Sequence, residues 1–305
     1  MIWKAVMLAG VALGLALGAQ AQEIQAQETQ LQELGAQATS TPSEADIIAA
    51  PQSWRAVDAD RLVIMQTSQG RIILELSPEL APRHVDHFVA YIRAGLYDNT
   101  PFHRVIKGFM AQGGDVEATY GAEKMLPPLA AEFTIRRDPK RFVIDTADLA
   151  SEALVGLYKG MPIATQPGWL ADMSKDGQVE SWIPHCPGVL SSARTSDPNS
   201  ANAQFFLISD EGRHLDRKYT AKGRTLAGLE VILAIKLGPT PDGYPIANPD
   251  VVISARMASD IPTDSRPRAY VERTDIPKWR AALTEAFKNR TDICDLPPVP
   301  AVIFD

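Results

Sequence analysis

A chain of 305 residues can hold one large domain or two ordinary ones, and 45% hydrophobic with 22% charged residues is typical of a soluble globular protein. Its 30 basic against 37 acidic residues give a formal net charge of −7, which argues against nucleic acid as a partner. The two cysteines and five histidines form no recognisable ligand set, so we expect no metal and no other cofactor. His84 and His87, three residues apart on one face of an expected helix, are interpreted as solvated surface residues.

The first residues have the pattern of a signal peptide. Lys4 is followed by an apolar run over 5–17 and then by Ala19-Gln20-Ala21, which predicts a signal peptide over 1–21 with cleavage after Ala21. An N-terminal membrane anchor that is never cut is the alternative. Since no later stretch approaches the roughly eighteen apolar residues of a membrane helix, we expect no membrane span after signal removal and a periplasmic or secreted protein.

Residues 22–55 are rich in Gln, Ala, Glu, Ser and Thr, a composition that predicts a flexible linker. The folded region then opens with Leu62–Thr67 and Arg71–Leu76 on either side of a polar turn, which predicts a β-hairpin. A helix is expected from about Glu79 to Ala94, where Gly95 supplies a stop. Its buried stripe would consist of Val85, Phe88, Val89 and Ile92.

The most informative segment follows this helix. It runs from Phe102 to Asp115 with the sequence FHRVIKGFMAQGGD and combines one arginine, one glutamine and several large apolar groups. A second segment, Gln204-Phe205-Phe206-Leu207, comes much later in the chain. The two segments, in this order, resemble the two halves of the active site of a cyclophilin, in particular of the bacterial periplasmic branch.

The resemblance implies a mainly β fold: a cyclophilin-like eight-stranded antiparallel β-barrel closed by two α-helices, in a domain over residues 56–258. It also implies a peptidyl-prolyl cis/trans isomerase that accelerates X-Pro isomerisation during the folding of exported proteins. The partners would then be proline-containing polypeptides, unfolded or folding, and we expect a monomer.

Two parts of the chain have no place in a compact cyclophilin. One is an insertion over about 134–184, whose aromatic residues predict packed structure. The other is a C-terminal extension over 259–305 with one helix. Pro277 would enter this helix and Asp275 would cap it, and one face would carry an apolar stripe for packing on the barrel, with the groove of a partner as the alternative. The stripe consists of Trp279, Ala282, Leu283, Ala286 and Phe287.

Cys186 and Cys294 stand at the end of the insertion and after the terminal helix, so a disulfide between them would pin the extension to the insertion. An exported protein enters an oxidising compartment, which permits this bond. Spacing alone does not establish it, and two free thiols are the alternative.

An X-Pro bond isomerises slowly because amide resonance sets a barrier of about 18–20 kcal/mol. A catalyst must favour the twisted state, in which the imide nitrogen regains a lone pair, by donating a hydrogen bond to it. Arginine suits this task because it stays charged and offers several N–H donors in a rigid fork. By resemblance Arg104 is the catalytic residue. Gln112 would hold the guanidinium or bind the substrate backbone.

The proline ring needs an apolar pocket, and the resemblance places it against Phe109, Met110, Phe206 and Leu215. Isolated aromatic residues of this kind are more often residues of the hydrophobic core. Their position inside the two cyclophilin-like segments favours a pocket instead. Further residues would bind substrate or support the site. Ala193 would line the shallower wall and Gln204 would bind substrate backbone, while Tyr219 would donate to a substrate carbonyl and Phe102 and His103 would be supporting residues.

Three positions depart from the pattern of compact eukaryotic members. Arg194-Thr195 stands where those have Asn-Ala, Tyr219 stands at the position of a histidine, and His214 replaces a tryptophan. The last change predicts poor binding of the cyclic peptide cyclosporin.

Two readings compete with an isomerase. A non-catalytic proline-peptide binding module, or holdase chaperone, would keep the pocket without the chemistry, and the presence of Arg104 argues against it. A hydrolase would need an ordered nucleophile motif, and nothing in the sequence resembles one.

Overall fold

The computed structural model describes residues 41–148 and 152–305. The predicted signal peptide, 1–21, and most of the predicted linker lie outside these residues. The chain divides into two units, Met1–Asp46 and Ile47–Asp305. In the first unit, Asp46 Oδ2 accepts a hydrogen bond of 3.2 Å from Ser43 N beside the start of helix α2 (Glu44–Ile48). Among the described residues, no helix combines the length and the apolar character needed to cross a membrane.

The main sheet of the second unit is antiparallel, and two smaller sheets accompany it, so the mainly β expectation is confirmed. Within the described residues nine strands pair in the order β4-β14-β2-β3-β13-β11-β12-β6-β5. Their bounds are β2 (Leu62–Thr67), β3 (Gly70–Leu76), β4 (Thr100–Pro101), β5 (Arg104–Ile106), β6 (Met110–Gly113), β11 (Val189–Ser192), β12 (Phe205–Ile208), β13 (Ala221–Ala227) and β14 (Val251–Met257).

The two end strands of this order show that the sheet curls back on itself. β4 and β5 stand at opposite ends of the ladder, yet only Phe102 and His103 separate them in the chain. The three Cα–Cα steps from Pro101 to Arg104 span at most about 11 Å, so the two edges must lie close together. The count of nine strands differs from the expected eight, and β4 is a strand of only two residues that pairs with β14.

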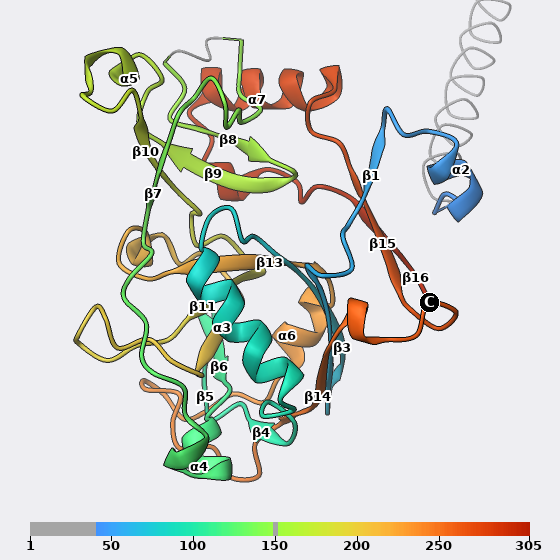
Figure 1. Ribbon diagram of the computed structural model, residues 1–305, viewed down its shortest axis with the longest axis vertical. Coiled ribbons are helices and arrows are strands. Elements are labelled where there is room, and N and C mark those ends of the chain that lie inside the picture. The colour runs from blue at the N-terminus through green and yellow to red at the C-terminus, as the bar shows by residue number, and fades with distance from the viewer. Residues whose placement is uncertain (1–40, 149–151) are drawn as a thin grey trace, which may run out of the picture. The chain divides into compact units, whose positions relative to one another are not determined.

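Helices pack against the apolar face of this sheet, and α3 (Pro82–Arg93) crosses in front of the sheet in Figure 1. The helix begins three residues later than the sequence predicts, because Pro82 is suited to the first helical position and forces Ala81 out of the helical region. Buried residues of α3 and of α6 (Leu229–Ala234) belong to one apolar cluster with the strands. They are Val85, Phe88, Tyr91, Ile92 and Ile232.

The expectation that His84 and His87 are surface residues is wrong for His84, which is 1% exposed. Its Nδ1 lies 2.9 Å from Ser192 Oγ, and its Nε2 lies 3.2 Å from the carbonyl oxygen of Ala130. Burial and the nearby charge of Lys222 lower the pKa of His84 to about 4. The helix therefore presents this histidine to the sheet, where its two ring nitrogens have partners.

The insertion forms its own antiparallel sheet in the order β7-β10-β9-β8. The strands are β7 (Ile135–Arg137), β8 (Val155–Tyr158), β9 (Met161–Thr165) and β10 (Val179–Trp182), with helix α5 (Leu170–Met173) between the last two. Phe142 packs on Tyr158 with ring centroids 4.2 Å apart, as expected of a packed insertion. Trp169 does not follow that expectation, because its side chain is 48% exposed.

The C-terminal extension holds more than the one expected helix. α7 (Pro277–Asn289) is joined by β15 (Arg268–Glu272) and β16 (Ala301–Phe304), which pair with β1 (Trp54–Ala56) in the order β1-β15-β16. The assignment of 22–55 to a flexible linker is therefore wrong at its end. β1, β15 and β16 are short and pair across most of the length of the chain, so the sequence around them shows no periodic pattern that would predict a strand.

Helix α7 buries Trp279, Leu283 and Ala286 as its pattern predicts, whereas Phe287 is 40% exposed. Asp275 does not cap the helix. Its carboxylate pairs instead with Arg273, and Ile276 occupies the capping position without a side-chain hydrogen bond.

The Sγ atoms of Cys186 and Cys294 form a disulfide, with the two Cα atoms 5.0 Å apart. Short helices complete the fold: α4 (Val116–Tyr120) and the 3-10 turns Ala122–Lys124, Arg213–Leu215, Ala258–Asp260 and Ile293–Asp295.

Candidate active site

Three strands of the main sheet bring the predicted polar residues together. Arg104 on β5 lies opposite Gln112 on β6, and its Nη1 donates a hydrogen bond of 3.2 Å to Gln112 Oε1. Gln112 Nε2 in turn donates to Gln204 Oε1 at 2.9 Å, just before β12. A second anchor comes from Arg104 Nε, which donates to the carbonyl oxygen of Asp242 at 3.0 Å. All these acceptors are neutral, so within the described residues no carboxylate pairs with the Arg104 charge.

The guanidinium stands at a pocket of about 260 Å³ that is lined by both polar and apolar side chains. Met110 and Phe206 are 2% and 4% exposed, and Leu215 is 9% exposed, so the apolar side chains that form the floor are almost wholly buried. Phe206 meets Tyr219 edge to face with centroids 5.7 Å apart. The lining residues are Arg104, Phe109, Met110, Gln112, Ala193, Arg194, Phe206, His214, Leu215 and Tyr219.

Three predicted site residues lie outside this lining. Gln204 stands behind Gln112 and reaches the pocket only through it. Phe102 is 1% exposed and meets Phe205 edge to face at 6.2 Å, on the helix-covered side of the sheet. His103 is partly buried, its Nδ1 has no hydrogen-bond partner within the described residues, and burial lowers its pKa.

The first motif ends at Gly114, where the backbone requires glycine. Its φ is +76°, and a Cβ there would lie 2.8 Å from the ring of Phe205 and 2.9 Å from that of Tyr97. The turn at this point thus keeps β6 in register with β12 and holds Gln112 under the arginine.

Two lining residues were noted in the sequence only as departures from the pattern. Arg194 lies with its guanidinium 4.3 Å from the centroid of the Tyr219 ring, and it donates to the carbonyl oxygen of Lys218. The ring of His214 packs on Phe109 at 5.1 Å. Arg194 follows Ala193 in the sequence and His214 precedes Leu215, so their position next to predicted pocket residues could have indicated that they line the pocket.

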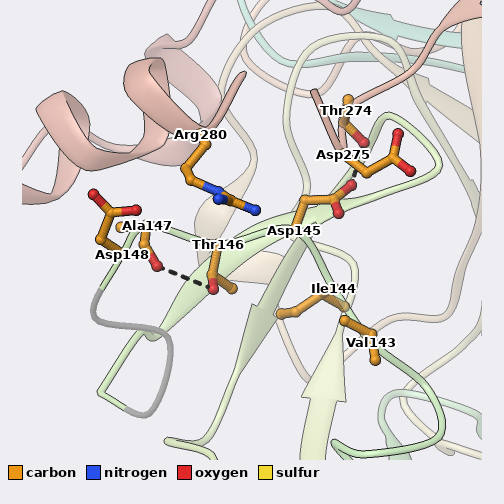
Figure 2. A pocket seen from close by; sticks show the side chains of 9 residues that line it. All are labelled: Val143, Ile144, Asp145, Thr146, Ala147, Asp148, Thr274, Asp275 and Arg280. Carbon is orange, nitrogen blue, oxygen red and sulfur yellow. Dashed lines mark hydrogen bonds between the residues drawn. The ribbon is translucent and has the colours of Figure 1, made fainter. Parts of the chain in front are cut away.

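A second cavity, of about 350 Å³, lies between the insertion and the C-terminal extension. Figure 2 shows Arg280 reaching from α7 toward Asp145, whose Oδ2 accepts a hydrogen bond of 2.5 Å from Thr274 Oγ1. Burial raises the pKa of Asp145. This cavity contains no residue of either sequence motif, and in the described part of the chain no cluster of three His, Cys, Asp or Glu residues could hold a metal ion.

The chemistry that fits the first pocket needs no ionisation and no nucleophile. A fixed guanidinium beside an apolar, poorly hydrated floor can donate a hydrogen bond to a group that gains electron density only in a transition state. A twisted imide nitrogen above a seated proline ring is such a group.

Comparisons with known proteins agree with this geometry. The family model described as "Cyclophilin type peptidyl-prolyl cis-trans isomerase/CLD" matches residues 62–257. A probable peptidyl-prolyl cis-trans isomerase of Brucella suis biovar 1 is 33% identical over 213 residues, which are 70% of this chain and 90% of that protein. Peptidyl-prolyl cis-trans isomerase A of Dickeya dadantii is 28% identical over 204 residues, 64% of this chain and 83% of the relative.

Among solved structures, the cyclophilin AquaCyp293 from Hirschia baltica is 45% identical and superposes with a TM-score of 0.80. The match covers 87% of this chain and 98% of that one, a larger share than residues 62–257 make up. The likeness therefore extends beyond the residues of the family model.

Proposed function

Because the chain belongs to the cyclophilin-type peptidyl-prolyl cis-trans isomerases, we propose that it accelerates X-Pro isomerisation in exported polypeptides while they fold. The observation that carries the chemistry is the placement of Arg104, held by two neutral acceptors at the rim of the apolar pocket. A module that only holds proline-containing segments would need the pocket but not a guanidinium held in this way.

In the proposed mechanism the proline ring sits against Phe206, Met110 and Leu215, where burial of its apolar surface holds the substrate. Rotation about the X-Pro bond breaks amide resonance and returns a lone pair to the imide nitrogen. Arg104 then donates an N–H to this nitrogen. Since the guanidinium is already fixed by Gln112 and Asp242, little reorganisation is needed when the charge develops.

Two features support a role outside the cytoplasm. The sequence over 1–21 has the pattern of an exported protein, and the Cys186–Cys294 disulfide suits an oxidising compartment. We therefore propose a periplasmic or secreted monomer whose partners are proline-containing segments of other exported proteins. The molar mass of the purified protein, measured by light scattering, tests whether it is a monomer.

Cell fractionation with N-terminal sequencing tests the location. A soluble periplasmic or extracellular chain that begins at Gln22 is the expected result. A full-length chain in the membrane fraction would instead support the uncut anchor. The isomerase activity itself is measured separately, by exchange spectroscopy on an Ala-Pro peptide, so that location and chemistry are tested independently.

A further inference from the structure

One wall of the pocket is the 3-10 turn Arg213–Leu215. This turn is not part of the sheet, so no hydrogen bonds between strands hold it in place. This turn supplies Leu215, and His214 packs from it onto Phe109. A position error of about 1 Å in such a wall can cost an enzyme on the order of a hundredfold in rate. The contacts that hold this turn therefore bear on catalysis.

Asp216, directly after the turn, is its first anchor. Its Oδ1 accepts hydrogen bonds from His185 N at 2.8 Å and from His185 Nδ1 at 3.1 Å, and its Oδ2 accepts one from Arg213 Nε at 2.6 Å. Burial alone would raise the pKa of Asp216, but the hydrogen bonds from His185 and Arg213 outweigh burial and lower it. The carboxylate thus stays charged and ties the turn to the end of the insertion.

His185 carries this anchor to the floor of the pocket. Its ring is fully buried and lies nearly parallel to the ring of Phe206, with an interplanar angle of 17° and centroids 6.1 Å apart. Gly212 N also donates to the carbonyl oxygen of His185 at 2.9 Å. The floor residue Phe206 and the wall residue Leu215 are therefore positioned by one histidine.

The second anchor comes from the C-terminal extension. Arg213 Nη1 pairs with Asp292 Oδ2, while Asp292 Oδ1 accepts a hydrogen bond of 2.9 Å from Cys294 N. Cys294 is bonded to Cys186, the residue after His185. The contacts close a ring that runs from Asp292 through Arg213, Asp216, His185 and the disulfide back to Asp292.

We propose that the C-terminal extension is part of the active-site apparatus and that Asp292 is a positioning residue for the isomerase reaction. Asp292 acts on the substrate only through Arg213, which holds the turn carrying His214 and Leu215. Arg213 and Asp292 are both partly exposed, and an ion pair of this kind adds little to stability, so the main effect of this contact is on geometry rather than on folding. The inference rests on the isomerase function proposed above.

The test compares Asp292, which caps the 3-10 turn Ile293–Asp295, with Asp295 at the end of that turn, in the full mature chain with its disulfide intact. Asp292→Asn keeps an acceptor for Cys294 N but removes the charge that pairs with Arg213, whereas Asp295 is exposed and has no ion pair within the described residues. We expect Asp292→Asn to lower kcat/KM for an Ala-Pro peptide about three- to tenfold, a typical size for coupling of this kind. Asp295→Asn should match the wild type.

A second readout separates positioning from general damage. The ring signals of His214 in NMR spectra should shift in Asp292→Asn and not in Asp295→Asn, and Asp292→Glu, which restores a carboxylate, should recover part of the rate. Wild-type kcat/KM and unshifted His214 signals in Asp292→Asn would overturn the proposal, even if its melting temperature fell. Equal losses in both asparagine variants would overturn it too, because they would show a general charge effect.

The same experiment keeps this inference apart from the proposed function. If the wild type were no faster than Arg104→Ala, the isomerase function would fail. If the wild type were active and Asp292→Asn equally active, only the positioning role of Asp292 would fail.

Discussion

Arg104 and Gln112 face each other across the β5–β6 pair, and the hydrogen bond between Arg104 Nη1 and Gln112 Oε1 measures 3.2 Å. Gln112 is itself held by Gln204 from the far side. The Arg104 guanidinium is thus oriented by neutral amides, which fix its direction and leave its charge free for the role proposed above.

Replacing the guanidinium should remove the chemistry while sparing the fold. We expect Arg104→Ala to lower turnover on an Ala-Pro peptide about 10²- to 10³-fold, because one preorganised donor is lost. Peptide affinity should fall much less, since Phe206, Met110 and Leu215 still hold the ring. Exchange spectroscopy, peptide titration and the melting temperature measure the three quantities. A variant that keeps its rate but loses affinity would make Arg104 a recognition residue.

Gln112→Ala should have a smaller effect than Arg104→Ala. It removes one of the two hydrogen bonds that orient the guanidinium, worth about 1 kcal/mol, so turnover should fall about fivefold while the bond to Asp242 remains. Steady-state kinetics on the same peptide gives the ratio. A loss as large as that of Arg104→Ala would show that Gln112 contacts the reacting bond itself.

Lys222 should make stability depend on pH. Its ammonium group is buried, donates to Ser192 Oγ at 2.9 Å and lies 4.4 Å from the centroid of the Phe88 ring. Burial lowers its pKa from 10.5 to about 7. Between these values the unfolded chain binds more protons than the folded one, so the contribution of Lys222 to stability rises with pH across this window and is flat below pH 7.

Lys222→Met checks this assignment. Methionine is unbranched, only one atom shorter than lysine, and packs well on an aromatic ring. The variant should therefore be more stable than the wild type at pH 6 and should lose the rise above pH 7. Urea unfolding at pH 6, 7.5 and 9 gives the comparison. An unchanged slope in the variant would assign the pH dependence to other groups.

Reduction of the disulfide should destabilise the chain. The bond joins residues 108 positions apart, and for a loop of this length the chain-entropy model gives roughly 4–5 kcal/mol. We expect the urea midpoint of Cys186→Ser/Cys294→Ser to fall accordingly, and thiol titration of the denatured, unreduced wild type to find no free thiol. Two reactive thiols in that titration would contradict the bond.

His214→Trp should improve binding of cyclosporin, which we expect to be poor in the wild type. His214 sits at the pocket rim against Phe109, and an indole there would add about 50 Å² of apolar contact, worth roughly tenfold in affinity. Calorimetric titration of both proteins measures the change. Equal affinities would mean that another departure, such as Tyr219, limits binding.

Sequence patterns were most informative where the residues of the site stand close together in the chain. Arg104, Gln112 and Phe206 stand in dense motifs, so the sequence alone was enough to expect them in one pocket. The hairpin over 62–76 followed from two strand-like runs around a polar turn and is confirmed.

Contacts between distant segments were beyond such reasoning. The burial of His84 depends on Ser192 across the sheet, and the role of Asp292 depends on Arg213. Neither partner lies within one helical turn or one strand of the residue it holds, so no spacing in the sequence could indicate the pairing. The small sheet was missed for the same reason.

That small sheet ties the beginning of the second unit to its end, since Trp54–Ala56 pairs with residues 270–272 of β15. A polypeptide released early, after β14, would contain every strand of the main sheet and the whole pocket, yet β1 would expose a row of unpaired N–H and C=O groups. Such an open edge is a template for other chains. Premature termination should therefore yield aggregates rather than a shorter working enzyme, because β15 is the strand that covers this edge of β1.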